Sequence, residues 1–170
     1  MIRKSDIYVL AGEVAYGKPD ATLRDLASYL ELPDHSAVQR AYQRAREAGL
    51  MDENGVINRA QVEEFLVHAS RFLAPAPLGP LTAGTPAVWA AEPMADRIRS
   101  PAQEPPPVWP SASGRIRGQE LEPLHPAAVA AAGKHPELGR ILSIVDSIRA
   151  GDLRVRTVAA EELRDTLRNA

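Results

Sequence analysis

Proline is unevenly distributed along the chain, and this restricts the fold more than any other feature of the sequence. Ten of the 15 prolines lie between residues 75 and 110. A proline has no backbone N–H to donate and fixes its own φ angle, so long helices cannot form in this segment. Helical periodicity is present before the segment and returns after about residue 125. We therefore predict a mainly α protein with three segments, 1–74, 75–124 and 125–170.

The first segment predicts four helices. Apolar residues recur at helical spacing over residues 5–16, 22–30 and 58–73. They also do so over a stretch that follows Pro33 and ends near residue 48. This spacing of three and four residues places the apolar side chains of each stretch on one helical face. The four helices can therefore share one small core.

Local signals mark where these elements begin and end. Thr22 and Asp25 form a capping box at the start of the second helix, and Gly17 ends the first helix. Asn54-Gly55 suits the turn of a hairpin between two short strands. The order helix, helix, turn, helix, hairpin, helix is that of a winged helix-turn-helix domain. In such a domain the third helix protrudes far enough to enter the major groove of DNA.

The outward face of the third helix carries polar side chains that suit DNA. Arginine can donate two hydrogen bonds to guanine, and glutamine can pair with adenine in the major groove. A hydroxyl, an imidazole and free backbone amides at the helix start suit a phosphate group. The residues that we expect to contact double-stranded DNA are Thr22, His35, Ser36, Gln39, Arg40, Gln43 and Arg44.

The alternative is an ordinary helical hairpin whose charged side chains only face water. Residues 1–75 contain nine Lys or Arg and eleven Asp or Glu, a net charge of −2. The hairpin sequence DENG adds two acids and no base, so it would be a poor minor-groove contact. Nonspecific affinity scales with the number of phosphates neutralised. We therefore expect modest affinity, which a dimer would raise by doubling the contact surface.

Three short patterns occur in order between Thr22 and Leu50: T-L-x-x-L-A-x-x-L, then V-x-R-A after a turn, then A-G-L. Over about residues 5–73 the chain resembles MarR-type and related winged-helix bacterial transcriptional regulators. The resemblance implies a repressor that acts as a homodimer on palindromic operators, with Arg40 in contact with DNA. The acidic hairpin and the proline-rich continuation depart from the family's pattern, which leaves the type of operator open.

The proline-rich segment, 75–124, has three interpretations: a flexible tether, a polyproline II docking site, or an ordered strap packed on the helices. The sequence EPPPVWP is of polyproline II type. Apolar side chains are too frequent for a tether, and we favour the strap. The stretch VWPSASGRIRGQELEPL predicts a strand-turn-strand hairpin with core contacts from Trp109, Ile116 and Leu121.

The last segment, 125–170, predicts a short helix after Pro126 and two longer helices over about residues 136–150 and 155–168. We expect their apolar stripes to serve dimerisation or binding of a partner protein. The chain from GPLTAG onward also looks like uncharacterised bacterial helix-turn-helix proteins, some of which lie beside nucleotidyltransferase-like genes. This resemblance implies the alternative function, an antitoxin-type autoregulator that binds a protein partner such as a nucleotidyltransferase-like toxin, and not DNA.

Composition and motifs argue against several other classes of function. The absence of cysteine excludes disulfides, thiolate metal sites and a cysteine nucleophile. The four histidines have no second ligand at the spacing of a metal motif, and no phosphate-binding loop or nucleophile motif occurs. No apolar run approaches the roughly 20 residues of a membrane span. We expect a cytoplasmic bacterial protein without cofactor, metal or enzymatic activity.

Overall fold

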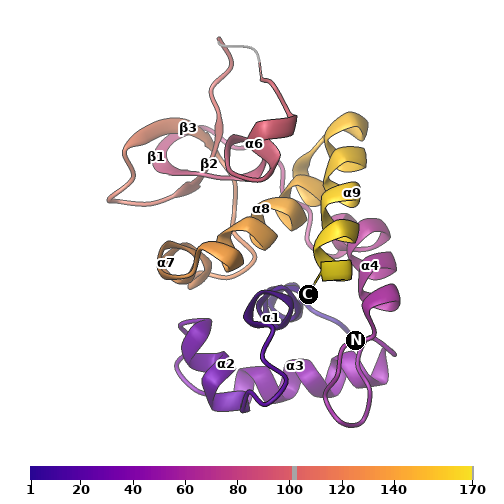
Figure 1. Ribbon diagram of the computed structural model, residues 1–170. Helices are drawn as coiled ribbons and strands as arrows, with labels where there is room; N and C mark the ends of the chain where they lie inside the picture. The colour runs from indigo at the N-terminus through magenta and orange to yellow at the C-terminus, as the bar shows by residue number, and fades with distance from the viewer. Residues whose placement is uncertain (101–102, 170) are drawn as a thin grey trace.

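The computed structural model describes residues 1–100 and 103–169, which form a mainly helical protein with one small sheet (Figure 1). Pro101 and Ala102 of the strap, and Ala170, lie outside the described residues. In chain order the elements are α1 (Lys4–Tyr16), α2 (Leu23–Tyr29), α3 (Ser36–Glu47), α4 (Arg59–His68), α5 (Ser70–Leu73), β1 (Leu81–Pro86), the 3-10 helix η1 (Val88–Ala90), α6 (Met94–Arg97), β2 (Pro107–Pro110), β3 (Ile116–Glu120), α7 (Ala128–Lys134), α8 (Pro136–Ala150) and α9 (Leu153–Asn169). The predicted mainly α class is confirmed.

The first three helices pack against one another at one end of the molecule (Figure 1). α2 begins where the capping box predicts, since Thr22 Oγ1 accepts a hydrogen bond from Asp25 N at 3.1 Å. The carboxylate of Asp25 in turn accepts from Thr22 N at 2.9 Å. α1 approaches α2 closely at Gly12, where a Cβ would lie 2.5 Å from Cδ2 of the buried Leu30. A side chain at Gly12 would therefore push the two helices apart.

The hairpin after α3 is smaller than predicted. A single bridge between Met51 and Ile57 takes the place of the two short strands that we expected. The carboxylate of Asp52 organises the turn, because its Oδ1 accepts from Asn54 N at 2.9 Å and from Val56 N at 2.8 Å. This side-chain bonding adds to two backbone bonds across the loop, from Asp52 N to Val56 O and from Asn58 N to Leu50 O. The wing of the predicted domain is therefore reduced to a compact acidic turn.

The strap is ordered over its described residues, and the two strands predicted within it are present as β2 and β3. Their predicted pairing as an antiparallel hairpin is wrong. β2 and β3 run parallel to each other, and both pair antiparallel with β1 to close a three-stranded barrel. Two glycines make room for this closure. A Cβ at Gly118 would lie 2.1 Å from Pro106 O, and one at Gly84 would lie 2.3 Å from Trp109 O. The sequence did not predict β1, LTAGTP, because glycine, alanine and proline are poor strand formers.

α8 is the central helix of the molecule (Figure 1). It contacts α1 on one side, η1 and α6 of the strap on another, and α4, α5, α7 and α9 around the rest. Residues 58–73, predicted as one helix, divide at Ala69 into α4 and α5. One continuous apolar core joins all three segments of the chain. The apolar stripe of α8 is therefore used inside the chain, whereas we expected it to serve a dimer or partner.

Asp146 and Arg149 of α8 are charged side chains that lie inside this core. Trp109 Nε1 donates to Asp146 Oδ2 at 2.8 Å, and Arg149 pairs with the other carboxylate oxygen of Asp146. Arg149 Nε also donates to Ala74 O at 2.8 Å. Burial raises the pKa of Asp146, and the charge of Arg149 and the Trp109 hydrogen bond oppose that rise. The network links α8 to β2 and to the end of α5, so it fixes the strap to the helices.

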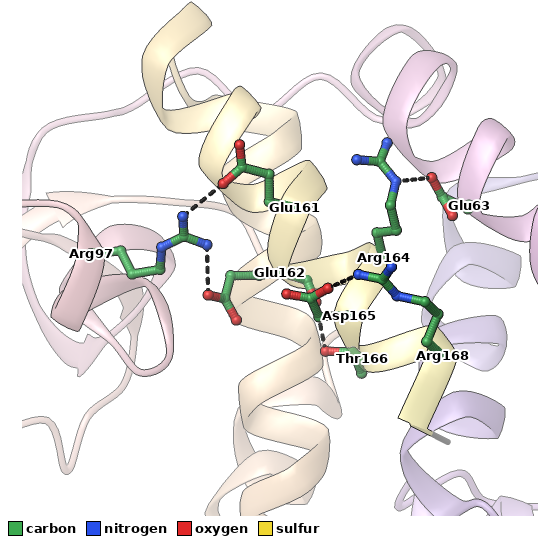
Figure 2. A network of polar contacts seen from close by, with 8 residues as sticks. All are labelled: Glu63, Arg97, Glu161, Glu162, Arg164, Asp165, Thr166 and Arg168. Carbon is green, nitrogen blue, oxygen red and sulfur yellow. Dashed lines mark hydrogen bonds and ion pairs between the residues drawn. The ribbon is translucent and has the colours of Figure 1, made fainter.

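Ion pairs on the surface join α9 to its neighbours. Figure 2 shows Arg97 of α6 between Glu161 and Glu162, at 2.7 and 2.8 Å. On the other side of α9, Arg164 lies 2.7 Å from Glu63 of α4. Exposed pairs of this kind contribute little to stability. The position of α9 therefore depends mainly on its buried apolar residues, which are Val155, Ala159, Leu163 and Leu167.

Candidate nucleic-acid interface

α3 packs against α1 and α2 through its apolar side and leaves its polar side on the surface. Val38, Ala41 and Ala45 are buried, and the hydroxyl of Tyr42 donates to the carboxylate of Glu13 on α1. Burial raises the pKa of both groups of that pair. Figure 1 places α3 at the lower edge of the molecule, on the far side of α1 from α8 and the sheet. The C-terminal half of the chain therefore leaves the outer face of α3 uncovered.

Gln39, Arg40 and Gln43 lie exposed on this outer face. Arg40 donates from one terminal nitrogen to Ser36 Oγ at 3.1 Å, and Gln43 donates to the carboxylate of Glu47 at 3.1 Å. Both are exposed contacts within one helix, and water or a ligand can replace such bonds at small cost. The three residues occupy positions i, i+1 and i+4, so they form one contiguous polar row.

Arg44 does not belong to this row, which corrects our expectation. Its Nε and one terminal nitrogen donate to the two carboxylate oxygens of Asp6 on α1, at 2.7 and 2.6 Å. Asp6 is 1% exposed and the Arg44 side chain 17%. These hydrogen bonds from Arg44 to Asp6 raise the pKa of Arg44. One residue beyond Gln43, the helix has turned toward α1, so Arg44 holds the two helices together and is not free to contact a base.

The start of α3 is less suited to a phosphate than its sequence suggested. Ser36 N donates to Asp34 Oδ1 at 2.6 Å, and hydrogen bonding to Ser36 lowers the pKa of Asp34. A charged carboxylate at this position repels a phosphate group. His35 is half-buried, and its side chain makes no capping hydrogen bond. Ser36 and His35 therefore lie at the edge of the candidate interface.

α2 contributes one residue that we predicted and one that we missed. Thr22 is exposed, but its hydroxyl both accepts from Asp25 N and donates to Asp25 Oδ2, at 3.1 and 2.7 Å. Arg24 shares a hollow of about 380 Å³ with His35, beside the start of α3. Its guanidinium has no partner among the described residues. Arg24 supplies a positive charge close to the start of α3. The helical periodicity of residues 22–30 already placed it on the outward face of α2, and this was the signal in the sequence.

Metal sites and membrane spans lack support in the part of the chain that the structure describes. Within residues 1–100 and 103–169, no group of three His, Cys, Asp or Glu side chains could hold a metal ion. None of the described helices is both long and apolar enough to span a bilayer. Neither a protein-family model, nor a curated protein, nor a solved structure matches this chain. Its function must therefore be inferred from the geometry around α3.

Proposed function

We propose that this protein is a DNA-binding transcriptional regulator of the winged helix-turn-helix kind, with α3 as its recognition helix. One observation carries the proposal. α3 stands at the edge of the fold, fixed to α1 and α2 through buried alanines, Val38 and the Asp6–Arg44 pair. Its opposite face presents Gln39, Arg40 and Gln43 to solvent. A helix held rigidly on one side with a polar row on the other is the form in which proteins read a major groove.

The side chains of this row match the edges of base pairs. Arg40 offers the two parallel donors that fit guanine O6 and N7, whereas Gln39 and Gln43 can each donate to and accept from adenine. Arg24 lies beside the start of the helix, where a phosphate contact would help to set its register. Net charge over residues 1–75 is −2, so sequence-specific base contacts must supply much of the affinity.

Replacement of Arg40 tests this function. A duplex is first selected from a random-sequence pool with the full-length protein, and its affinity is then measured by fluorescence anisotropy at about 150 mM salt. We expect Arg40→Ala to weaken binding about 5- to 150-fold, since a bidentate contact to guanine is worth about 1–3 kcal/mol. Arg154→Ala is the matched control, because Arg154 is exposed on α9 and has no partner among the described residues.

The two variants remove the same charge, so they separate a specific contact from bulk electrostatics. Equal losses for Arg40→Ala and Arg154→Ala would mean that α3 is not the reader. Failure to select any duplex would contradict DNA binding itself, and would favour the alternative of an antitoxin-type module that binds a partner protein.

We propose further that the regulator is a homodimer, and that its contact surface lies between α5 and α9. Phe72 and Leu153 are 69% and 72% exposed and line one groove of about 480 Å³. The charged residues of its lining are Arg71, Arg156, Arg164 and Glu161, so the groove is mainly positive. The exposed apolar side chains therefore carry this proposal, because large exposed apolar side chains in a groove are typical of protein–protein contacts. The same exposed apolar side chains are the observation that favours a protein partner in the alternative function.

Phe72→Glu tests the dimer. A glutamate in place of phenylalanine removes the apolar contact and adds a charge that is costly to bury in an interface, so we expect the variant to be monomeric. Light scattering coupled to gel filtration gives the mass of each species directly. Val56→Glu serves as control, because Val56 is 61% exposed in the turn after α3, away from this groove. A homodimer with a Kd of about 1 µM or lower is populated at protein concentrations of about 1 µM and above. Wild-type protein that stays monomeric in that range would contradict the dimer.

A further inference from the structure

A cleft of about 1290 Å³ lies between the small sheet, α7 and the start of α1. It shares Arg3, Ser5 and His125 with a smaller pocket that Arg40 of α3 also lines. The walls of the cleft come from three parts of the chain: β1 and β2, the region of α7 with the start of α8, and residues 3–5 at the start of α1. Ligand sites in proteins commonly have volumes of about 300–1,000 Å³. The cleft is therefore large enough for a small organic molecule, and neither the DNA-binding proposal nor the dimer uses it.

One part of the lining of the cleft is apolar. It includes Trp109, Leu124 and Val129. The indole of Trp109 is held by its hydrogen bond to the buried Asp146, and Leu124 is 3% exposed. Gly133 and Gly139 also line the cleft, and the absence of side chains at these positions contributes to its width. A flat apolar body could lie against this wall and displace water from it.

The remaining polar lining carries more positive than negative charge. Lys4 is paired with Glu122 at 2.8 Å. Arg140 lies 3.7 Å from Glu92, a long contact between side chains that are 43% and 70% exposed. The guanidinium of Arg3 has no partner among the described residues. One unpaired and one loosely paired guanidinium therefore remain for an anionic group.

His125, also in the lining, adds a neutral hydrogen-bonding group. Burial lowers its pKa, so the imidazole is uncharged at neutral pH. Its Nδ1 accepts from Ala127 N at 3.1 Å, which leaves the proton of the neutral ring on Nε2. The ring is fixed by stacking on Tyr8, with 5.1 Å between centroids. The Nε2–H group of this fixed ring can donate a hydrogen bond to an oxygen atom of the ligand.

We propose that this cleft binds a small amphipathic organic anion. Its planar apolar body lies against Trp109, Leu124 and Val129, and its acidic group meets Arg3 and Arg140. The combination of an apolar wall and guanidinium groups at the rim selects this class over neutral apolar molecules and over inorganic anions. This proposal does not rest on the proposed DNA binding.

Two fluorescent probes of similar shape and different charge test the proposal. The first is 1-anilinonaphthalene-8-sulfonate, a sulfonate, and the second is N-phenyl-1-naphthylamine, its uncharged relative. Both are titrated into the full-length Phe72→Glu protein, so that the groove between α5 and α9 does not contribute. We expect one site that prefers the sulfonate about fivefold or more, the size of an exposed charge contact.

Three variants locate the site. Arg3→Gln and Arg140→Gln should each weaken sulfonate binding about threefold to fivefold and leave the neutral probe unaffected. Gly133→Phe should abolish binding of both probes, because Gly133 lines the cleft, a Cβ there meets no atom within 4 Å, and we expect the ring to fill part of the cleft. Arg154→Gln is the charge control. Equal affinity for the two probes, or unchanged binding by Gly133→Phe with native circular dichroism, would overturn the proposal.

Discussion

Arg149→Met is expected to lower the free energy of unfolding by about 3–5 kcal/mol, the usual cost of breaking a buried ion pair. The Arg149 side chain is 0% exposed and that of Asp146 is 1% exposed. Methionine replaces most of the arginine's apolar volume, so the loss is electrostatic and does not come from a cavity. The variant leaves the Asp146 charge without its cation and Ala74 O without the donor Nε of Arg149. Urea titration followed by circular dichroism measures the change.

Two further variants isolate this electrostatic cost. Arg168→Met removes an arginine that is 67% exposed and paired within α9, so it should change stability by no more than about 0.5 kcal/mol. The double variant Asp146→Leu/Arg149→Met removes both charges and should be more stable than Arg149→Met alone. It should stay below wild type, since the Trp109 indole loses its acceptor. A cost below about 1 kcal/mol for Arg149→Met would show that the network does not fix the strap.

The effect of Arg149→Met should also depend on pH. Burial raises the pKa of Asp146 in the folded protein, and the variant lacks the positive charge that opposes this rise. The folded state then binds a proton more readily than the unfolded chain, where an aspartate has a pKa of about 3.9. Stability from such a group is present at acid pH and is lost as pH rises through the raised pKa. The difference from wild type should therefore widen as pH rises above about 3.9, the pKa of an aspartate in the unfolded chain, and a constant difference would contradict this explanation.

Local features of the fold could be predicted from the sequence, because capping and helix periodicity involve residues a few positions apart. The capping box at Thr22 and the stop at Gly17, with its φ of 57°, are examples. The barrel could not be predicted, because its pairing joins residues far apart, such as Leu81 with Gln119. Asp146 and Arg149 did carry a signal, since charges inside the apolar run ILSIVDSIRA indicate a buried pair. Their partners Trp109 and Ala74 belong to other segments.

The candidate interface, like the fold, could be predicted only in its local features. Helical periodicity placed Gln39, Arg40 and Gln43 on the outward face, and they lie exposed there. Whether Arg44 reaches the surface depends on the angle between α3 and α1, and helical periodicity does not specify that angle. Asp6, within the apolar face of the first helix, was the available signal for a buried cation partner.

Arg44→Met should lower the free energy of unfolding by about 3 kcal/mol, whereas Arg40→Met should leave it unchanged within about 0.5 kcal/mol. Breaking a fully buried ion pair costs about 3–5 kcal/mol. Because the Arg44 side chain is 17% exposed, we expect a cost at the low end of this range. Both arginines lie on α3 and differ only in their surroundings. Arg40 is exposed and bonds Ser36, while Arg44 neutralises a carboxylate that is 1% exposed. Urea titration of the two variants measures the difference.

Asp6→Asn provides the rescue that separates charge from packing. The asparagine can still accept the hydrogen bond that Arg3 N gives to Asp6 at 2.8 Å, but it needs no cation. Asp6→Asn/Arg44→Met should therefore recover part of the stability that Arg44→Met loses, and the double-mutant cycle gives the coupling energy of the pair. If instead Arg44→Met is as stable as wild type and loses DNA affinity as Arg40→Met does, Arg44 belongs to the reading face. The pair with Asp6 would then break readily in solution, and α3 would present four polar side chains to the duplex instead of three.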